Sequence, residues 1–166
     1  MKKLLIVLLI AAALFSFSCK SGPSTANPNI EGEVTQAKVN DALSQIYNTY
    51  RTRLDMTGAQ EYTVERGDTL SQITRKYYGS LTGVGDAGPS NGFYFPVIMM
   101  AAESNIVDPD LIEPGMQLKI VDLKRNLDNP ISRKAIKDCL VDVAYVYNKK
   151  GVQASEDGLR RLAESL

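Results

Sequence analysis

The sequence contains no histidine among its 166 residues, and this absence excludes several classes of enzyme. Zinc hydrolases with histidine ligands, Cys-His peptidases and Ser-His-Asp hydrolases all need an imidazole as metal ligand or general base. None of these sites can be assembled from this chain alone. An excess of one charge is also missing, since 19 basic residues balance 19 acidic residues. Nucleic-acid binding requires a basic face, so no nucleic-acid partner is expected.

The one long apolar run, residues 4–17, follows the basic residues Lys2 and Lys3. A run of about 14 residues is too short for a membrane-spanning helix, which needs about 20, but it suits the core of a secretory signal. Residues 1–18 are therefore predicted to be a signal peptide. Their removal takes away two lysines and leaves a small acidic excess.

The end of the predicted signal, Phe15-Ser16-Phe17-Ser18-Cys19, resembles a relaxed bacterial lipoprotein signal, in which Cys19 would carry the lipid, palmitate included. It departs from the usual lipobox, since Ser16 and Phe17 stand where a leucine and a small residue are common. Ser16 and Ser18 also satisfy the small-x-small rule of an ordinary signal peptidase, so plain secretion is the alternative. The lipoprotein reading implies a bacterial envelope protein that is anchored to a membrane and faces the periplasm.

The chain has two cysteines, so the fate of Cys19 decides the disulfide chemistry. If Cys19 is acylated, Cys139 is left without a partner in the chain. Cys139 lies among apolar residues of a predicted helix, and we expect a buried, unreactive thiol there. A Cys19–Cys139 disulfide is the alternative.

Residues 19–33 are rich in Ser, Gly, Pro and Asn, and they have too little apolar content to offset the entropy of ordering. They are predicted to form a flexible tether, which would reach about 45–50 Å when extended. Residues 34–57 are predicted to contain an amphipathic helix, which we expect to dock within the chain. Its apolar residues recur at steps of three and four: Val39, Leu43, Ile46 and Tyr50.

Residues 61–121 begin with a β-prone run and a helix start. Tyr62 and Val64 alternate with polar residues, as a half-buried strand requires. Thr69 and Gln72 form a capping-box pattern, which predicts the start of a helix. The face of this helix that is expected to contact the sheet consists of Leu70, Ile73 and Tyr77.

The same stretch ends in the reverse order, with a helix, a turn and a second strand. Pro96 lies near the first turn of the predicted second helix, where its missing N–H costs little. Pro114-Gly115 is a turn signal, and beyond it Leu118 and Ile120 alternate with a lysine. The predicted class is α+β, with a strand–helix–helix–strand domain, a two-stranded antiparallel sheet and additional amphipathic helices on its flanks.

The two ends of residues 61–121 resemble the LysM domain, a small module known for binding N-acetylglucosamine-containing glycans. The resemblance rests on YTVERGDTLSQI at residues 62–73 and on N-x5-L-I-x-P-G-x-x-L-x-I at residues 105–120. It implies a shallow groove between the loop after the first strand and the loop before the second. The glycan-binding residues that it implies are Gly67, Asp68, Thr69, Leu70, Asn105, Ile106, Val107, Asp108, Pro109, Asp110, Leu111 and Ile112.

The middle of this stretch departs from the family pattern. The segment between the two predicted helices, residues 80–94, is longer than the usual link, and Phe93-Tyr94-Phe95 occupies the region where a tryptophan often stands. The insert either folds over the groove, adds aromatic contacts or extends into solvent. Residues 83–88 form a G-x-G-x-x-G pattern, but a dinucleotide site needs a strand before it and a helix after it. We therefore read this segment as a loop.

Residues 122–130 are predicted to be a polar connector, and residues 131–166 a helical extension. A last short helix is expected to begin with Ser155 as its cap. We expect the flanking helices to pack together, or against the helical side of the module, and to leave the groove free. The longer helix, over residues 132–149, carries an apolar stripe of Ile136, Leu140, Val143 and Tyr147.

The predicted function is non-catalytic binding of peptidoglycan, with a lipid holding the protein to a membrane and the module holding it to the cell wall. No cofactor and no metal are implied. The alternative is an envelope adaptor whose flanking helices recruit a protein partner, with glycan binding only for localisation. A glycan hydrolase would need two carboxylates across a cleft, and the family gives no support for one. Its candidates by proximity alone are Glu61, Asp68, Asp108 and Asp110.

Overall fold

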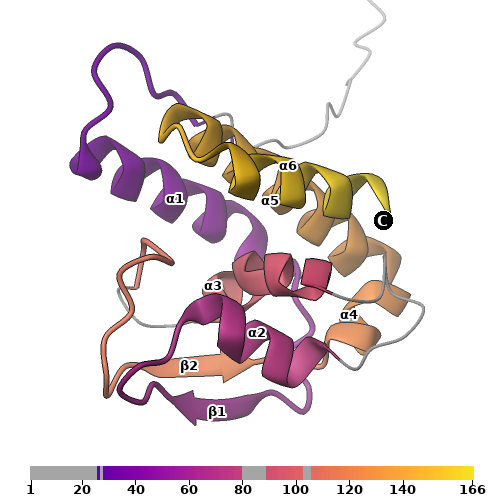
Figure 1. The fold of residues 1–166 in the computed structure, drawn as a ribbon. Helices are drawn as coiled ribbons and strands as arrows, with labels where there is room; N and C mark the ends of the chain where they lie inside the picture. The colour runs from indigo at the N-terminus through magenta and orange to yellow at the C-terminus, as the bar shows by residue number, and fades with distance from the viewer. Residues whose placement is uncertain (1–25, 27, 80–88, 103–105) are drawn as a thin grey trace, which may run out of the picture.

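The computed structural model describes residue 26 and residues 28–79, 89–102 and 106–166. These residues form two layers, one of helices and one of mixed α and β structure (Figure 1). The helical layer consists of α1 (Gln36–Tyr50), α5 (Pro130–Lys149) and α6 (Gln153–Glu164). The mixed layer consists of β1 (Gln60–Thr63), α2 (Leu70–Tyr78), α3 (Phe95–Ala101) and β2 (Gln117–Ile120). Two short 3-10 helices, η1 (Arg51–Arg53) and η2 (Pro89–Tyr94), follow α1 and precede α3.

The two strands pair antiparallel, with Gln60 opposite Ile120. Backbone contacts extend beyond the strands, since the N–H of Val64 donates to the carbonyl of Met116 at 2.9 Å. The N–H of Gly115 in turn donates to the carbonyl of Val64 at 2.8 Å. Gly115 has a φ of +92°, which residues with a side chain rarely adopt, and so the predicted turn requires this glycine. The predicted strand–helix–helix–strand order and α+β class are confirmed.

Helix α2 begins with the predicted capping box, in which the side chains of Thr69 and Gln72 each accept from the other's backbone N–H. The buried face differs from the prediction at one position. Tyr78 is buried and Tyr77 is not, because Tyr78 lies about two turns after the first buried leucine and shares its face. Tyr77 is half-buried and packs edge-on against Tyr62 of β1, with ring centroids 5.7 Å apart.

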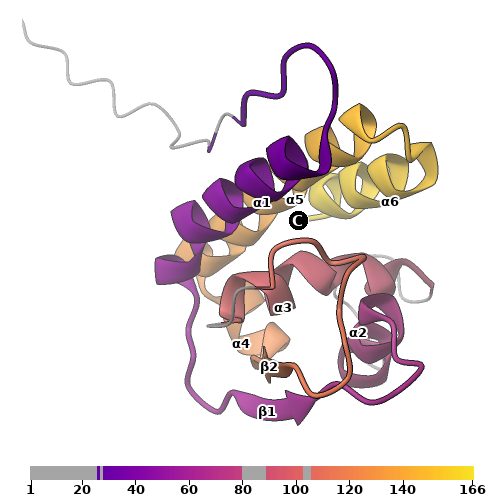
Figure 2. The same ribbon diagram turned by 90° about the vertical axis from the view of Figure 1, so that its left-hand side faces the viewer.

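Helix α3 joins the two layers. Every residue of it is buried, as expected of a helix that is apolar all round. It contacts β2 on one side and α1 and α5 on the other (Figure 2). Pro96 lies in its first turn, where the sequence predicted it. One hydrophobic core therefore runs through both layers.

The apolar stripes predicted for α1 and α5 are buried, and these two helices contact each other. After a turn at Gly151, whose φ is +73°, α6 returns along α5. The prediction that Ser155 caps α6 was wrong, because the helix begins at Gln153 and Ser155 lies within its first turn. The carbonyl of Val152 already accepts from the N–H of Glu156, and with Val152 in the cap position the helix starts three residues earlier than expected.

The predicted polar connector, residues 122–130, contains a further helix, α4 (Leu123–Asp128). Asp122 caps it, and Leu123 and Leu127 are buried on one face. The prediction was wrong because the charged residues between the two leucines concealed an apolar pair at helical spacing.

The described part of the predicted tether, residues 19–33, packs against the helical layer around Ala26 and Ile30, whereas residues 31–33 are exposed. Ala26 and Ile30 are buried, and the N–H of Ala26 donates to the carboxylate of Asp142 in α5 at 3.0 Å. For this part the prediction of a free tether was wrong, because the segment has apolar side chains and a backbone donor with partners on the helices. The rest of the tether lies outside the described residues.

Cys139 is a buried free cysteine of α5, and burial raises the pKa of its thiol well above the ordinary value. This state agrees with the unreactive thiol expected there. Cys19 and the predicted signal, residues 1–18, lie outside the described part of the chain. In the part that is described, no helix has the length and apolar character needed to cross a membrane.

Candidate functional site

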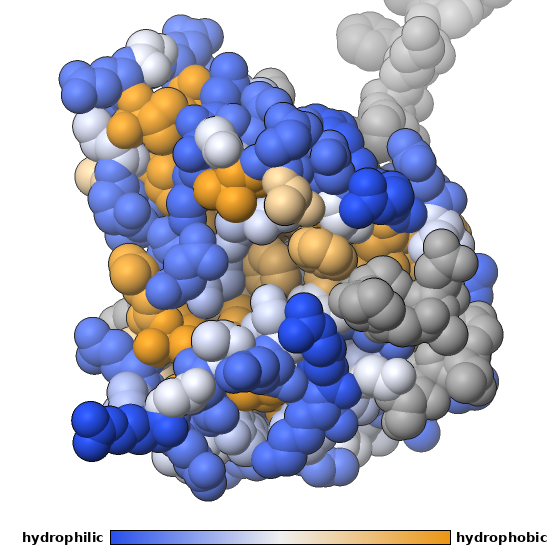
Figure 3. All heavy atoms as spheres, in the orientation of Figure 1, coloured by the Kyte–Doolittle hydropathy of each residue, from blue (hydrophilic) through white to orange (hydrophobic). Residues whose placement is uncertain are grey.

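A cleft of about 250 Å³ lies where the start of α2 faces the loop before β2. Apolar side chains are visible in the hollow between the C-terminal helices and α2 (Figure 3). The lining residues are Asp68, Thr69, Leu70 and Ser71 around the start of α2, Phe93 and Phe95 next to α3, Pro109, Asp110 and Ile112 before β2, and Tyr147 and Ser155 of α5 and α6.

Half of the predicted glycan-binding residues line this cleft, and they come from both loops. Leu70 lines it but is only 3% exposed, so its side chain serves mainly the core. Asn105 lies outside the described residues. The other predicted residues lie in the two loops without lining the cleft: Gly67, Ile106, Val107, Asp108 and Leu111.

Beyond Val64, whose backbone pairs with Gly115 and Met116, the first loop, residues 64–69, is held by contacts close in the sequence. The carboxylate of Asp68 accepts from the hydroxyl of Tyr62 at 2.6 Å and from the N–H of Glu65 at 2.8 Å. These hydrogen bonds lower the pKa of Asp68, and the same bond to Asp68 raises the pKa of Tyr62 to about 12. Gly67, with a φ of +94°, allows the turn that brings these groups together.

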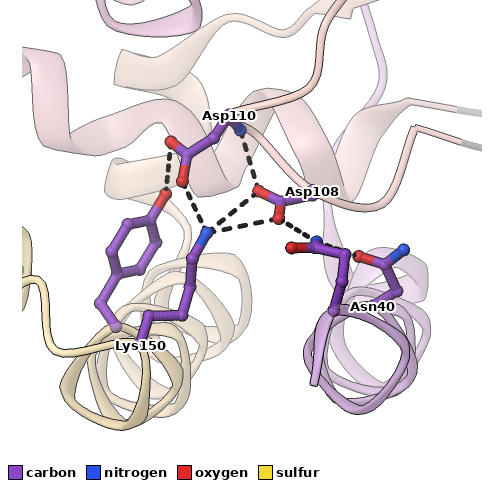
Figure 4. A network of polar contacts seen from close by, with 6 residues as sticks. Asn40, Asp108, Asp110 and Lys150 are labelled. Atoms are coloured by element: carbon purple, nitrogen blue, oxygen red, sulfur yellow. Dashed lines mark hydrogen bonds and ion pairs between the residues drawn. The ribbon is translucent and has the colours of Figure 1, made fainter. Parts of the chain in front are cut away.

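The second loop, residues 106–112, is held by two distant helices (Figure 4). The ammonium of Lys150 lies 3.3 Å from Asp108 and 2.6 Å from Asp110. Asp108 also accepts from the amide of Gln36 at 2.6 Å, and Asp110 accepts from the hydroxyl of Tyr147 at 3.1 Å. The same amide of Gln36 donates to the side-chain oxygen of Asn40 at 2.8 Å. We call Gln36, Asn40, Asp108, Asp110, Tyr147 and Lys150 the loop network.

Burial and charge oppose each other at Lys150. Burial by itself lowers its pKa, but the hydrogen bond to Asp110 and the charges of Asp108 and Asp110 outweigh that effect and raise the pKa. Lys150 is therefore an ammonium at neutral pH, and it compensates the charge of Asp108, whose side chain is 2% exposed. Because Asp108 is occupied in this way, it supports the loop and does not face a ligand.

The C-terminal helices reach the cleft, which corrects the expectation that they leave the groove free. Tyr147 of α5 lines the cleft and packs edge-on against Phe95 with ring centroids 5.9 Å apart. Ser155 of α6 lines the cleft as well. The reason is the position of α3, which contacts both β2 and α5 and so places the end of α5 beside the second loop. The sequence gives no local signal for Tyr147 beyond its place in an apolar stripe, and none for Ser71 or Ser155.

A larger hollow of about 570 Å³ lies beside the N-terminal segment. Its Asp142 already accepts from the hydroxyl of Tyr50 at 2.7 Å and from the N–H of Ala26, and burial raises the pKa of its carboxyl. We favour the smaller cleft as the functional site, since both predicted loops meet there. The larger hollow is lined by Pro28, Asn29, Glu31, Val141, Asp142, Tyr145 and Arg160.

Metal binding has no support in the described part of the chain, where no group of three or more His, Cys, Asp or Glu side chains is placed to hold an ion.

Residues 62–121 match the family model of the LysM domain. This segment is a LysM domain. The match includes the second half of β1, the whole of α2, α3 and β2, and both loops of the cleft. LysM domains are binding modules for N-acetylglucosamine-containing glycans such as peptidoglycan, so the match supports glycan binding. Neither the curated proteins nor the solved structures contain a significant match to the chain. Helices α1, α4, α5 and α6 lie outside the matched segment.

Proposed function

We propose that this protein binds peptidoglycan through the cleft of its LysM domain, without catalysis, and that a lipid on Cys19 ties it to a membrane. The observation that carries the glycan-binding part is the meeting of both LysM loops in one cleft. The protein would then link a membrane to the cell wall of a bacterial envelope.

The chemistry of the cleft suits an acetamido sugar. Pro109 and Ile112 supply apolar contacts for an acetyl methyl group and the ring faces. Thr69 and Asp110 supply polar atoms that can accept or donate hydrogen bonds to hydroxyl and amide groups. A concave, partly apolar surface with a few placed polar groups is the usual form of a small-ligand site.

The carboxylates of the cleft favour binding over hydrolysis. A glycosidase needs a carboxylic acid with a raised pKa as its proton donor. The pKa of Asp68 is lowered by its hydrogen bonds, and Asp108 and Asp110 are paired with Lys150. Glu61 lies in β1 opposite Lys119 and does not line the cleft.

The adaptor alternative receives less support from the helices than their sequence suggested. The apolar stripes of α1 and α5 that needed a partner are buried against each other and the core. A protein partner would have to bind the protein at a surface other than these apolar stripes.

The main test is co-sedimentation of the chain from Lys20 to Leu166 with insoluble peptidoglycan. This form keeps every contact described above. We expect retention of the unsubstituted chain and its loss in a variant with Thr69→Arg and Ile112→Arg, which place two long cations in the cleft. A matched control carries Thr52→Arg and Ile131→Arg at exposed positions outside the cleft and should be retained. Failure of the unsubstituted chain to sediment would refute the proposal, and release of a soluble glycan would refute its non-catalytic part.

The anchor is tested separately by mass spectrometry of the mature N-terminus. We expect a lipid mass on Cys19 that disappears with Cys19→Ala, and accumulation of the precursor in cells treated with globomycin. An unmodified Cys19 at the mature N-terminus would show plain secretion and leave only the glycan-binding part.

A further inference from the structure

We propose that the glycan site is composite: helices α5 and α6, which lie outside the LysM segment, form a third wall of the cleft and contact the bound sugar. This inference rests on the proposed glycan-binding function and adds residues to that site. The residues that would contact the sugar are Phe93 and Ser155, which are half-buried, whereas Tyr147 is only 4% exposed and acts through Asp110.

The first argument is the lining of the cleft. Tyr147 of α5 and Ser155 of α6 line it together with the two LysM loops. Ser155 is half-buried within the first turn of α6, where it lines the cleft and does not cap the helix. A sugar held between the two loops would therefore meet the start of α6.

The second argument is the packing of the Phe93 ring against α6. A Cβ added at Gly158 of α6 would overlap the ring of Phe93. The ring thus lies directly against the helix at the one residue of α6 that has no side chain. Phe93 is half-buried and lines the cleft, so α6 positions an aromatic ring beside the bound sugar.

The third argument is the loop network. Tyr147 donates to Asp110 at 3.1 Å and Lys150 contacts the same carboxylate at 2.6 Å, so α5 sets the direction of an acceptor that lines the cleft. The side chain of Asp110 is 54% exposed and can still accept from a sugar hydroxyl. The helices therefore act on the site both through their own side chains and through Asp110.

Size and charge indicate the ligand. The cleft of about 250 Å³ falls below the range of about 300–1,000 Å³ usual for drug-sized ligands, so it encloses roughly one sugar ring. Its described lining includes Asp68 and Asp110 but no lysine or arginine, which disfavours an anionic ligand. The wall is thus suited to an uncharged N-acetylhexosamine unit, and tetra-N-acetylchitotetraose is a suitable probe.

The test measures binding of tetra-N-acetylchitotetraose to the Lys20–Leu166 chain by calorimetry. Ser155→Arg should weaken binding at least tenfold, because the new side chain enters the cleft from α6. Ala154→Arg is the matched control, since Ala154 is exposed on the same turn and does not line the cleft, and its affinity should be unchanged. Ile112→Arg tests the LysM wall in the same assay.

The outcomes separate the two proposals. Loss of binding with Ile112→Arg but full binding with Ser155→Arg would overturn the composite site and leave the LysM site intact. Absence of binding by the unsubstituted chain would overturn the glycan-binding proposal and this one with it.

A second measurement needs no substitution and does not depend on the folding of a variant. Adding the tetrasaccharide to the isotope-labelled chain should shift the backbone amide signals of Phe93, Ser155 and Gly158 as well as those of residues 67–71 and 110–112. Shifts confined to the two LysM loops would contradict a third wall.

Discussion

The two loops that border the cleft differ in what holds them. Beyond Val64, which pairs with Gly115 and Met116 at the end of the sheet, the first loop, residues 64–69, is held by bonds between residues three to six positions apart, such as Asp68 with Glu65 and Tyr62. The second, residues 106–112, is held by residues 37 to 72 positions away, on α1 and α5. One wall of the site is therefore a local structure, whereas the other depends on helices outside the LysM domain. Substitutions that remove local contacts should therefore affect only the first loop, whereas those that remove distant contacts should affect the second loop and the stability of the whole fold.

The largest effect is expected from Lys150→Met. It leaves the buried carboxylate of Asp108 without its cation, which should lower the free energy of unfolding by about 3 kcal/mol. The free energy of unfolding is measured by urea denaturation of the Lys20–Leu166 chain. Lys124→Met is the matched control, because the Lys124–Asp128 pair is exposed and should contribute little to stability.

Adding Asp108→Asn to Lys150→Met should recover part of the loss, since the unpaired charge is then gone. An equal, small effect of Lys150→Met and Lys124→Met would mean that the loop network does not hold the second loop.

A smaller effect is expected from Thr69→Ala in the first loop. It removes the hydroxyl that accepts from the N–H of Gln72, and loss of such a cap costs about 1 kcal/mol. Thr69→Ser keeps the acceptor and should leave the free energy of unfolding nearly unchanged. If hydrogen exchange were to quicken in the second loop as strongly as at the start of α2, the two loops would not be independent.

The smallest effect is a pH dependence within the first loop. The pKa of Asp68 is lowered by its hydrogen bonds, so its contribution to stability is present above its unfolded value of 3.8. The contribution is lost as the pH falls through the lowered folded value. With Asp68→Asn this acid-dependent part should disappear from the stability curve.

The pKa of Tyr62 gives a second measure of the hydrogen bond between Tyr62 and Asp68. The pKa of Tyr62, raised to about 12 chiefly by the hydrogen bond to Asp68, should fall toward 10.0 with Asp68→Asn in an NMR titration of its ring. Lys150→Met should leave that pKa unchanged. A change with Lys150→Met would show that the first loop also senses the distant helices.

Local patterns in the sequence were sufficient for most of the LysM domain. The capping box of Thr69 and Gln72, the Pro114-Gly115 turn and the alternating strands each depend on residues a few positions apart. The same kind of signal predicted the apolar stripes of α1 and α5. It failed at α4, where charged residues lie between Leu123 and Leu127.

Only the tertiary structure decided where the stripes would dock and what would border the cleft. Because α3 is apolar on every side, its own pattern does not say which elements cover it. Its packing against β2, α1 and α5 brings Lys150 and Tyr147 to a loop about 40 residues earlier in the chain. Helical spacing places Tyr147 in the apolar stripe of α5 but cannot show that its hydroxyl donates to Asp110. The sequence by itself thus indicated the elements of the module and the turn of its first loop, through patterns among near neighbours. The second loop and the third wall depend on side chains that meet only when both layers share one core.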